Sequence, residues 1–189
     1  MKTVQATPEQ MEARTARFDR LGLWDVQTNP KLPQEARDLV YARRLLAITS
    51  PREAVGPLAN SAPIRDVDFT LHIAECPPGQ GPGLHAHHAT TETFLCLDGR
   101  FRISWGDRGE HEVILERWDT VSVPPGVVRG FENVGDDVAR LLILVTGGVS
   151  DMNDIAMTPE YRERLEAFGP DVVPELEKTG LRFDAGMGD

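Results

Sequence analysis

Residues 79–99 read GQGPGLHAHHATTETFLCLDG and contain three of the five histidines of the chain. His85 and His87 are two positions apart, so an extended strand places both imidazoles on the same side. His88 points to the opposite side of such a strand, and we expect it to be a neighbour rather than a ligand. Glu92 follows five residues after His87, which is far enough for the chain to turn and bring a carboxylate back. The stretch therefore predicts a metal site formed by His85, His87 and Glu92.

The chemistry of these three side chains supports that interpretation. Two neutral imidazoles and one carboxylate are the ligand set of open non-haem iron sites. The same set also binds catalytic zinc, with water in the remaining position. An octahedral ion held by three protein ligands keeps about three positions open for substrate or dioxygen. The sequence thus predicts a divalent metal ion as cofactor and does not distinguish iron, manganese, nickel and zinc.

The segments around this stretch carry the pattern of short β-strands. Apolar and β-branched runs recur between residues 42 and 147, separated by turns rich in glycine and proline. They read DFTLHIAE, ETFLCLDG, FRISWG, HEVILER, DTVSVPPG, VRGFENV and ARLLILVTG. Strands at such spacing, without alternating helices, predict an all-β sandwich or barrel over residues 42–147.

Helix signals occupy both ends of the chain. Residues 1–41 form the predicted N-terminal helical extension, in which Thr7 caps a helix that ends at Gly22. A second helix begins near Pro33 and changes into the first strand near Tyr41. Residues 148–189 form the predicted C-terminal helical extension and tail, with helices at 158–165 and 171–178.

Composition limits the possible partners. A chain of 189 residues with 26% charged residues fits one globular domain with extensions. Its net charge of −10 argues against nucleic-acid binding, because such a surface repels phosphate. No apolar run approaches the 18 residues of a membrane span, and no secretory leader pattern is visible. Two cysteines twenty positions apart, without a CxxC pair, argue against a zinc knuckle or a disulfide framework. We expect a cytoplasmic protein whose partner is a small molecule, with no nucleic-acid or membrane partner.

Residues 79–99 resemble the first motif of the cupin superfamily, and residues 118–133 resemble the second. The first motif is matched at every position and gap, by Gly79, His85, His87, Glu92 and Gly99. The second segment reads WDTVSVPPGVVRGFEN and matches at Asp119, Pro124, Gly126 and Asn133. Trp118 stands where the motif has glycine, and Arg129 stands where it has the histidine that normally binds the metal.

The resemblance implies a fold and a location for the site. Cupins are double-stranded β-helix jelly rolls, commonly homodimers, with iron, manganese, nickel or zinc bound inside the barrel. The resemblance does not imply one reaction, because function depends on the site and not on the fold.

Arg129 decides how the site is interpreted. A guanidinium about 6 Å from a divalent ion repels it by roughly 5 kcal/mol at an effective dielectric constant near 20. One interpretation is that an anionic substrate, a carboxylate or an enolate, bridges the metal and Arg129. The protein is then a metal-dependent enzyme, with dioxygenase-type chemistry as the first hypothesis and an isomerase or lyase using the same groups. Arg129 is its predicted catalytic and substrate-binding residue.

Two other positions of Arg129 stay open. It can pair directly with Glu92 in place of the metal, which predicts a non-catalytic cupin that binds or senses a small molecule. It can also turn outward and take no part in the site. Four further side chains are predicted to contact substrate on the inner wall of the barrel: His72, Phe94, Cys96 and Phe131. Each has an alternative as an ordinary core residue, Cys96 as a small buried hydrophobe.

Overall fold

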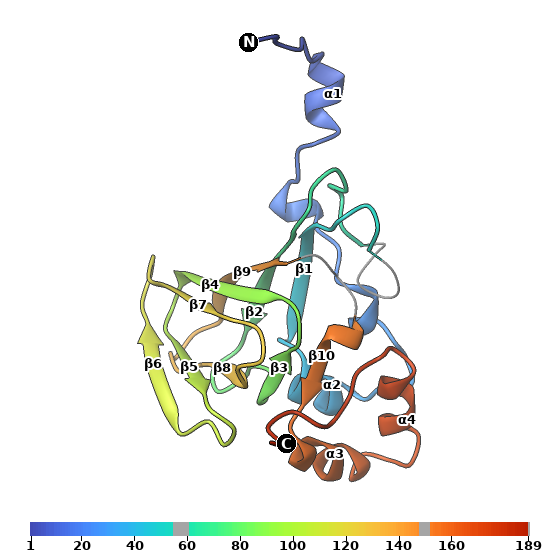
Figure 1. Cartoon of the computed structure of the whole chain (residues 1–189), viewed down its shortest axis with the longest axis vertical. Helices are drawn as coiled ribbons and strands as arrows, with labels where there is room; N and C mark the ends of the chain where they lie inside the picture. The colour runs from blue at the N-terminus through green and yellow to red at the C-terminus, as the bar shows by residue number, and fades with distance from the viewer. Residues whose placement is uncertain (55–60, 148–151, 189) are drawn as a thin grey trace.

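A computed structural model describes residues 1–54, 61–147 and 152–188 (Figure 1). Two antiparallel sheets face each other, as predicted for an all-β jelly roll. The first sheet has the order β1 (Arg44–Thr49), β2 (Thr70–Cys76), β9 (Ala139–Thr146), β4 (Thr91–Asp98) and β7 (Thr120–Val123). The second has the order β10 (Ile155–Met157), β3 (His85–His87), β8 (Arg129–Asn133), β5 (Phe101–Trp105) and β6 (His111–Leu115). This architecture is the double-stranded β-helix.

Alternation along the strands places one face of each sheet in a shared core. In β4, the residues Glu92, Phe94 and Cys96 are buried, and Thr93 and Leu95 between them are partly exposed. The equal parity predicted for these three inward side chains is therefore confirmed. Phe94 packs edge-on against Phe131 from the opposite sheet, with ring centroids 5.4 Å apart. The apolar interior joins the two sheets.

The described residues outside the barrel form four short helices and a strand. The helices are α1 (Pro8–Glu12), α2 (Gln34–Val40), α3 (Pro159–Glu166) and α4 (Val172–Glu177). Single turns of 3-10 helix occur at Phe18–Arg20, Asp25–Gln27 and Met152–Asp154. Helices α2, α3 and α4 lie together beside β10 (Figure 1). The sequence did not predict β10, which extends the second sheet by pairing with β3. The predicted boundary after residue 147 adjoins residues 148–151, which lie outside the described part of the chain.

The first predicted helix is only partly correct. Thr7 caps α1 and forms the capping box with Gln10, but the helix ends at Glu12 and not at Gly22. Met11 and Phe18, which would lie on one face of the longer helix, are 55% and 52% exposed. A short helix gains most of its stability from packing, and this segment projects away from the barrel (Figure 1). The change from helix to strand near Tyr41 is confirmed, since α2 ends at Val40 and β1 begins at Arg44.

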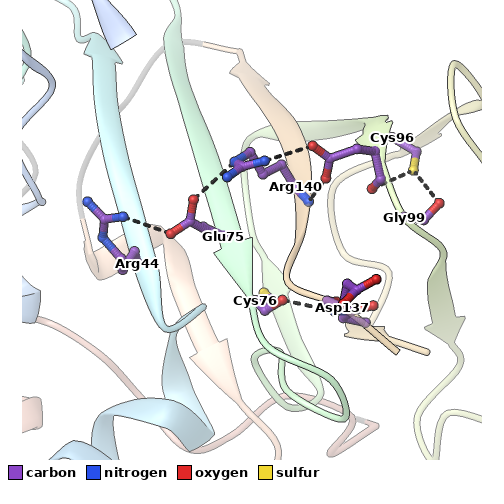
Figure 2. Close-up of polar contacts among 9 residues, drawn as sticks. Arg44, Glu75, Cys76, Cys96, Gly99, Asp137 and Arg140 are labelled. Carbon is purple, nitrogen blue, oxygen red and sulfur yellow. Dashed lines mark hydrogen bonds and ion pairs between the residues drawn. The ribbon is translucent and has the colours of Figure 1, made fainter. Parts of the chain in front are cut away.

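Charged side chains cross the outer face of the first sheet. Arg44 pairs with Glu75 at 2.7 Å, and Glu75 accepts a hydrogen bond from Arg140 at 3.0 Å (Figure 2). Arg140 also donates to Asp98 at 2.9 Å. We call Arg44, Glu75, Arg140 and Asp98 the outer charge ladder. No helix among the described residues has the length and apolar character needed to cross a membrane.

Candidate metal centre and its cavity

The three predicted ligands come together between the two sheets. His85 and His87 lie on β3 of the second sheet, and Glu92 lies on β4 of the first. The Nε2 atoms of His85 and His87 are 3.8 and 3.9 Å from Glu92 Oε2. Donor atoms of all three residues lie within 4.8 Å of one another, and all three residues are buried. His88, by contrast, is exposed, as expected for a neighbour.

Hydrogen bonds on the far side of each imidazole fix its tautomer. His85 Nδ1 lies 2.8 Å from the carbonyl oxygen of Gly83, which only accepts, so Nδ1 carries the proton. His87 Nδ1 lies 2.8 Å from Thr90 Oγ1. The Thr90 hydroxyl donates to Asp154 Oδ2 at 2.5 Å, so its oxygen accepts from His87. Both Nε2 atoms therefore present lone pairs toward Glu92.

These three ligand atoms fit a divalent cation. Two imidazole lone pairs and a carboxylate oxygen lie close together, and a cation can bind all three at once. Ligands about 2.1 Å from a common ion can stand up to about 4.2 Å apart, which includes both His–Glu distances. A partner on the outer nitrogen of each imidazole is the usual support of metal-binding histidines. Thr90 is this partner for His87, and Asp154, from the segment that leads into β10, holds the Thr90 hydroxyl in place.

Arg129 is fully buried and lies against Glu92. Its strand pairs with β3 so that Arg129 is opposite His85, which directs the guanidinium inward. Arg129 Nε donates to Glu92 Oε2 at 2.9 Å, and Nη1 donates to the carbonyl oxygen of Val127 at 3.2 Å. The outward position is therefore excluded. Arg129 does not line the cavity described below, and its contact in the site is with Glu92.

The charges of the site set the ionisation of its members. Burial acts to raise the pKa of Glu92, but the positive charge of Arg129 and the neighbouring imidazoles hold that pKa well below its usual range. Burial lowers the pKa of His87 well below its usual value, against the attraction of Glu92. Burial also lowers the pKa of His72 to about 4. Glu92 is thus ionised and His87 is neutral near pH 7, the states that metal binding requires.

A cavity of about 100 Å³ opens beside the three ligands. His85, His87 and Glu92 form part of its wall, and His72 and Phe131, two of the predicted substrate contacts, also line it. The rest is mainly aliphatic, and about half of all the lining residues lie outside residues 72–145. No lysine or arginine of the described residues lines it.

Two predicted substrate contacts are not brought to this cavity. Phe94 and Cys96 are fully buried in the barrel core, further along β4 than Glu92. The Cys96 thiol points to the carbonyl oxygens of Asp98 and Gly99 at the far end of the strand (Figure 2). The alternation of side chains along a strand predicts which residues face inward. It does not predict which of these residues line a cavity and which pack in the core.

The sequence interpretation missed four residues of the site: Trp24, Tyr41, Thr90 and Asp154. Trp24 and Tyr41 line the cavity from the N-terminal segment, and Asp154 lines it from the C-terminal segment. These three residues are far from the histidines in the sequence, so no local sequence pattern links them to the site. Thr90 was detectable, because it stands in the turn that joins the two ligand strands, where a hydroxyl reaches an adjacent imidazole.

Residues 72–145 match the family of the cupin domain. The cupin domain of Cnp3 from Schizosaccharomyces pombe is 17% identical, with 44% of this chain and 58% of that chain covered and a TM-score of 0.40. A double-stranded β-helix protein from Klebsiella pneumoniae is 23% identical, with 43% and 69% covered and a TM-score of 0.40. TT1209 from Thermus thermophilus is 17% identical, with 72% and 98% covered and a TM-score of 0.45.

No curated protein matches the sequence. The chain spans somewhat more than half of the fission yeast domain. Residues 72–145 are a cupin domain, as the two motifs predicted.

Proposed function

We propose that the protein is a metal-dependent cupin enzyme that acts on a small molecule with an anionic oxygen, a carboxylate or an enolate. Dioxygenase-type chemistry is the first reaction class to test. One observation carries the proposal: two imidazole lone pairs and a carboxylate face one another beside a cavity, with both tautomers fixed from behind. Glu92 Oε2 already accepts from Arg129, but the two imidazole lone pairs beside it have no donor among the described residues, and a cation bound by all three ligands would satisfy them.

Each residue of the site has a separate role in this proposal. His85, His87 and Glu92 would hold the ion, which would supply a Lewis acid for a substrate oxygen and, as iron, a redox couple for dioxygen. Thr90 and Asp154 keep His87 in the binding tautomer. Arg129 positions Glu92 and keeps it ionised, so it acts through a ligand and not on the substrate.

The charge balance supports an anionic oxygen at the metal. The charges of Glu92 and Arg129 cancel each other, and imidazoles bind a metal as neutral ligands, so a divalent ion would keep its two positive charges. With no lysine or arginine of the described residues in the cavity wall, that ion would be the group that attracts the anionic oxygen. The bridge between metal, substrate and Arg129 that the sequence suggested is replaced by a direct contact of the substrate with the metal.

The Arg129–Glu92 contact also favours a second candidate function. Their 2.9 Å hydrogen bond is the arrangement expected if arginine replaces the metal, in a cupin that binds or senses a small molecule without catalysis. In that case the acceptors of His85 and His87 would be satisfied by ligand or water donors.

Metal analysis separates the two functions. The wild type and the variants His87→Ala and His111→Ala are purified without added metal. Their metal content is then measured by inductively coupled plasma mass spectrometry. His111 is exposed on β6, away from the candidate site, and serves as the matched control. We expect close to one equivalent of metal in the wild type and in His111→Ala, and little in His87→Ala. A folded wild type that stays metal-free when iron, manganese, nickel and zinc are offered would contradict the enzyme and favour the sensor.

The sequence also predicts a cytoplasmic homodimer. Light scattering coupled to size-exclusion chromatography measures the oligomeric state directly. A mass of one chain would contradict the dimer.

A further inference from the structure

Three residues of the cavity wall carry polar groups that the proposed metal chemistry does not use. Trp24 Nε1, Tyr41 Oη and His72 Nδ1 are buried and have no hydrogen-bond partner among the described residues. All three residues line the cavity. Trp24 and Tyr41 are 1% and 6% exposed, so solvent outside the protein does not hydrate them.

Backbone pairing explains why these residues share one wall. Residue Leu23 pairs with Leu46 of β1, and Trp24 N donates to the carbonyl oxygen of Leu45 at 3.1 Å. In turn β1 pairs with β2 so that Ala47 lies opposite His72. The rings of Trp24 and His72 meet edge to face, with centroids 6.1 Å apart. The N-terminal segment thus completes a polar patch that the cupin domain alone does not contain.

An unpaired buried donor is uncommon in folded proteins and costs about 1–3 kcal/mol. Several such groups on residues of one cavity therefore point to a partner that enters the cavity. The indole N–H only donates, and the Tyr41 hydroxyl donates as well, because burial raises its pKa and keeps it protonated. The expected partner is a hydrogen-bond acceptor.

The surroundings limit the charge and the size of that acceptor. Without a lysine or arginine of the described residues in the wall, a carboxylate or phosphate would lie unpaired in an aliphatic space. A cavity of 150 Å³ holds benzene, so about 100 Å³ accommodates roughly four or five non-hydrogen atoms.

We infer that Trp24 and Tyr41, with His72 beside them, form a second subsite that binds a neutral acceptor oxygen, a carbonyl, hydroxyl or ether, of a compact and mainly apolar molecule. The inference rests on the proposed function in one respect, that the cavity is the substrate site. It deepens that function, because the substrate then has its anionic oxygen at the metal ligands and an uncharged oxygen at the other end.

The test uses two probes of five non-hydrogen atoms, 2-butanone and propionate. The full chain, stripped of metal, is labelled with ¹⁵N-tryptophan and titrated with each probe while the three indole N–H signals are followed. The variants Trp105→Phe and Trp118→Phe assign the Trp24 signal by elimination. We expect 2-butanone to shift the Trp24 signal downfield, and propionate to bind at least tenfold more weakly.

Two tyrosine variants provide a matched comparison. Tyr41→Phe removes the unpaired hydroxyl and should weaken 2-butanone binding about three- to tenfold, the usual range for one neutral hydrogen bond. It should unfold at the same or a higher temperature than the wild type, because an unsatisfied buried group is removed. Tyr161→Phe changes the other tyrosine of the chain, which does not line the cavity, and should bind 2-butanone like the wild type.

Three results would overturn the inference: a Trp24 signal that does not move at 50 mM 2-butanone, propionate binding as tightly as 2-butanone, or Tyr41→Phe binding like the wild type. Because the titration is performed without metal, its outcome is independent of the metal analysis. A protein that binds 2-butanone at Trp24 but never takes up metal keeps the subsite and loses the enzyme.

Discussion

The two faces of the first sheet use charged residues in opposite ways. On its outer face, the outer charge ladder joins four side chains, of which Arg44, Arg140 and Asp98 are 35–49% exposed. On its inner face, Glu92 meets Arg129, and both side chains are almost completely buried. The same kind of ion pair therefore occurs in contact with water on the outer face of the first sheet and in the protein interior between the two sheets.

Burial changes what such a pair contributes. Exposed ion pairs are screened and hold flexible side chains in place, so each contributes roughly 0–1 kcal/mol. Burying two charges removes the hydration of both, and the pair recovers that free energy only while both partners remain. We conclude that the outer charge ladder adds a little stability. Glu92 and Arg129 instead serve the candidate site, and each needs the other to compensate its buried charge.

The largest expected effect comes from breaking the inner pair. Arg129→Met keeps an unbranched side chain of similar reach but leaves the Glu92 carboxylate buried and unpaired. We expect the free energy of unfolding of metal-free protein to fall by about 3–5 kcal/mol, measured by urea denaturation.

A double variant controls for lost packing. Glu92→Gln combined with Arg129→Met removes both charges and should recover most of the lost stability. If Arg129→Met alone costs less than about 1 kcal/mol, the inner pair behaves like an exposed one, and the contrast between the faces fails.

Two hydroxyl contacts extend the comparison from charges to neutral groups. Thr90 links His87 to Asp154 inside the barrel, and Thr93 lies 2.8 Å from Ser122 Oγ on the outer face. Thr90→Val should weaken metal binding about 10–100-fold, because the tautomer of His87 is no longer fixed. Thr93→Val should leave the affinity within twofold. Competition with a chelator measures both, and equal affinities would show that the inner hydroxyl has no special role.

The buried side chain of His72 should make the stability of the protein depend on pH. Its pKa of about 4 lies below the value near 6.5 expected in the unfolded chain, so the unfolded state binds the proton more tightly. This contribution to stability is complete above pH 6.5 and is lost as the pH falls toward 4. Between pH 7 and pH 5 the wild type should lose about 2 kcal/mol more than His72→Gln, measured by denaturation at both values. Parallel pH profiles would mean that His72 is hydrated in the folded protein.

The part of the site that the sequence predicted depends on local geometry. The H-x-H spacing places His85 and His87 on one side of a strand because strand side chains alternate. The turn that follows returns Glu92 to them. These relations extend over eight residues and need no knowledge of the fold. The all-β class was also predictable, because turn residues and β-branched runs repeat along the middle of the chain.

The rest depends on pairings between distant segments. Arg129 binds Glu92 because β8 pairs with β3 in the register that places Arg129 opposite His85. The sequence alone was compatible with three different positions of the Arg129 side chain. Asp154 reaches Thr90 through the segment that leads into β10, which pairs only three residues with β3. Trp24 and Tyr41 lie far along the chain from the cavity residues that they join. Even the length of α1 depends on the absence of a packing partner, which a helical pattern does not reveal.

The smallest expected effect is on the outer charge ladder. Arg140→Met removes the central cation, which bonds Glu75 and Asp98, and should lower the free energy of unfolding by about 1 kcal/mol or less. That difference should shrink further in 1 M NaCl, where the Debye length is about 3 Å, while the effect of Arg129→Met should persist because the inner pair is not reached by salt. A loss of 3 kcal/mol or more for Arg140→Met would show that the two faces do not differ. Burial of an ion pair would then not decide how much the pair contributes to the free energy of unfolding.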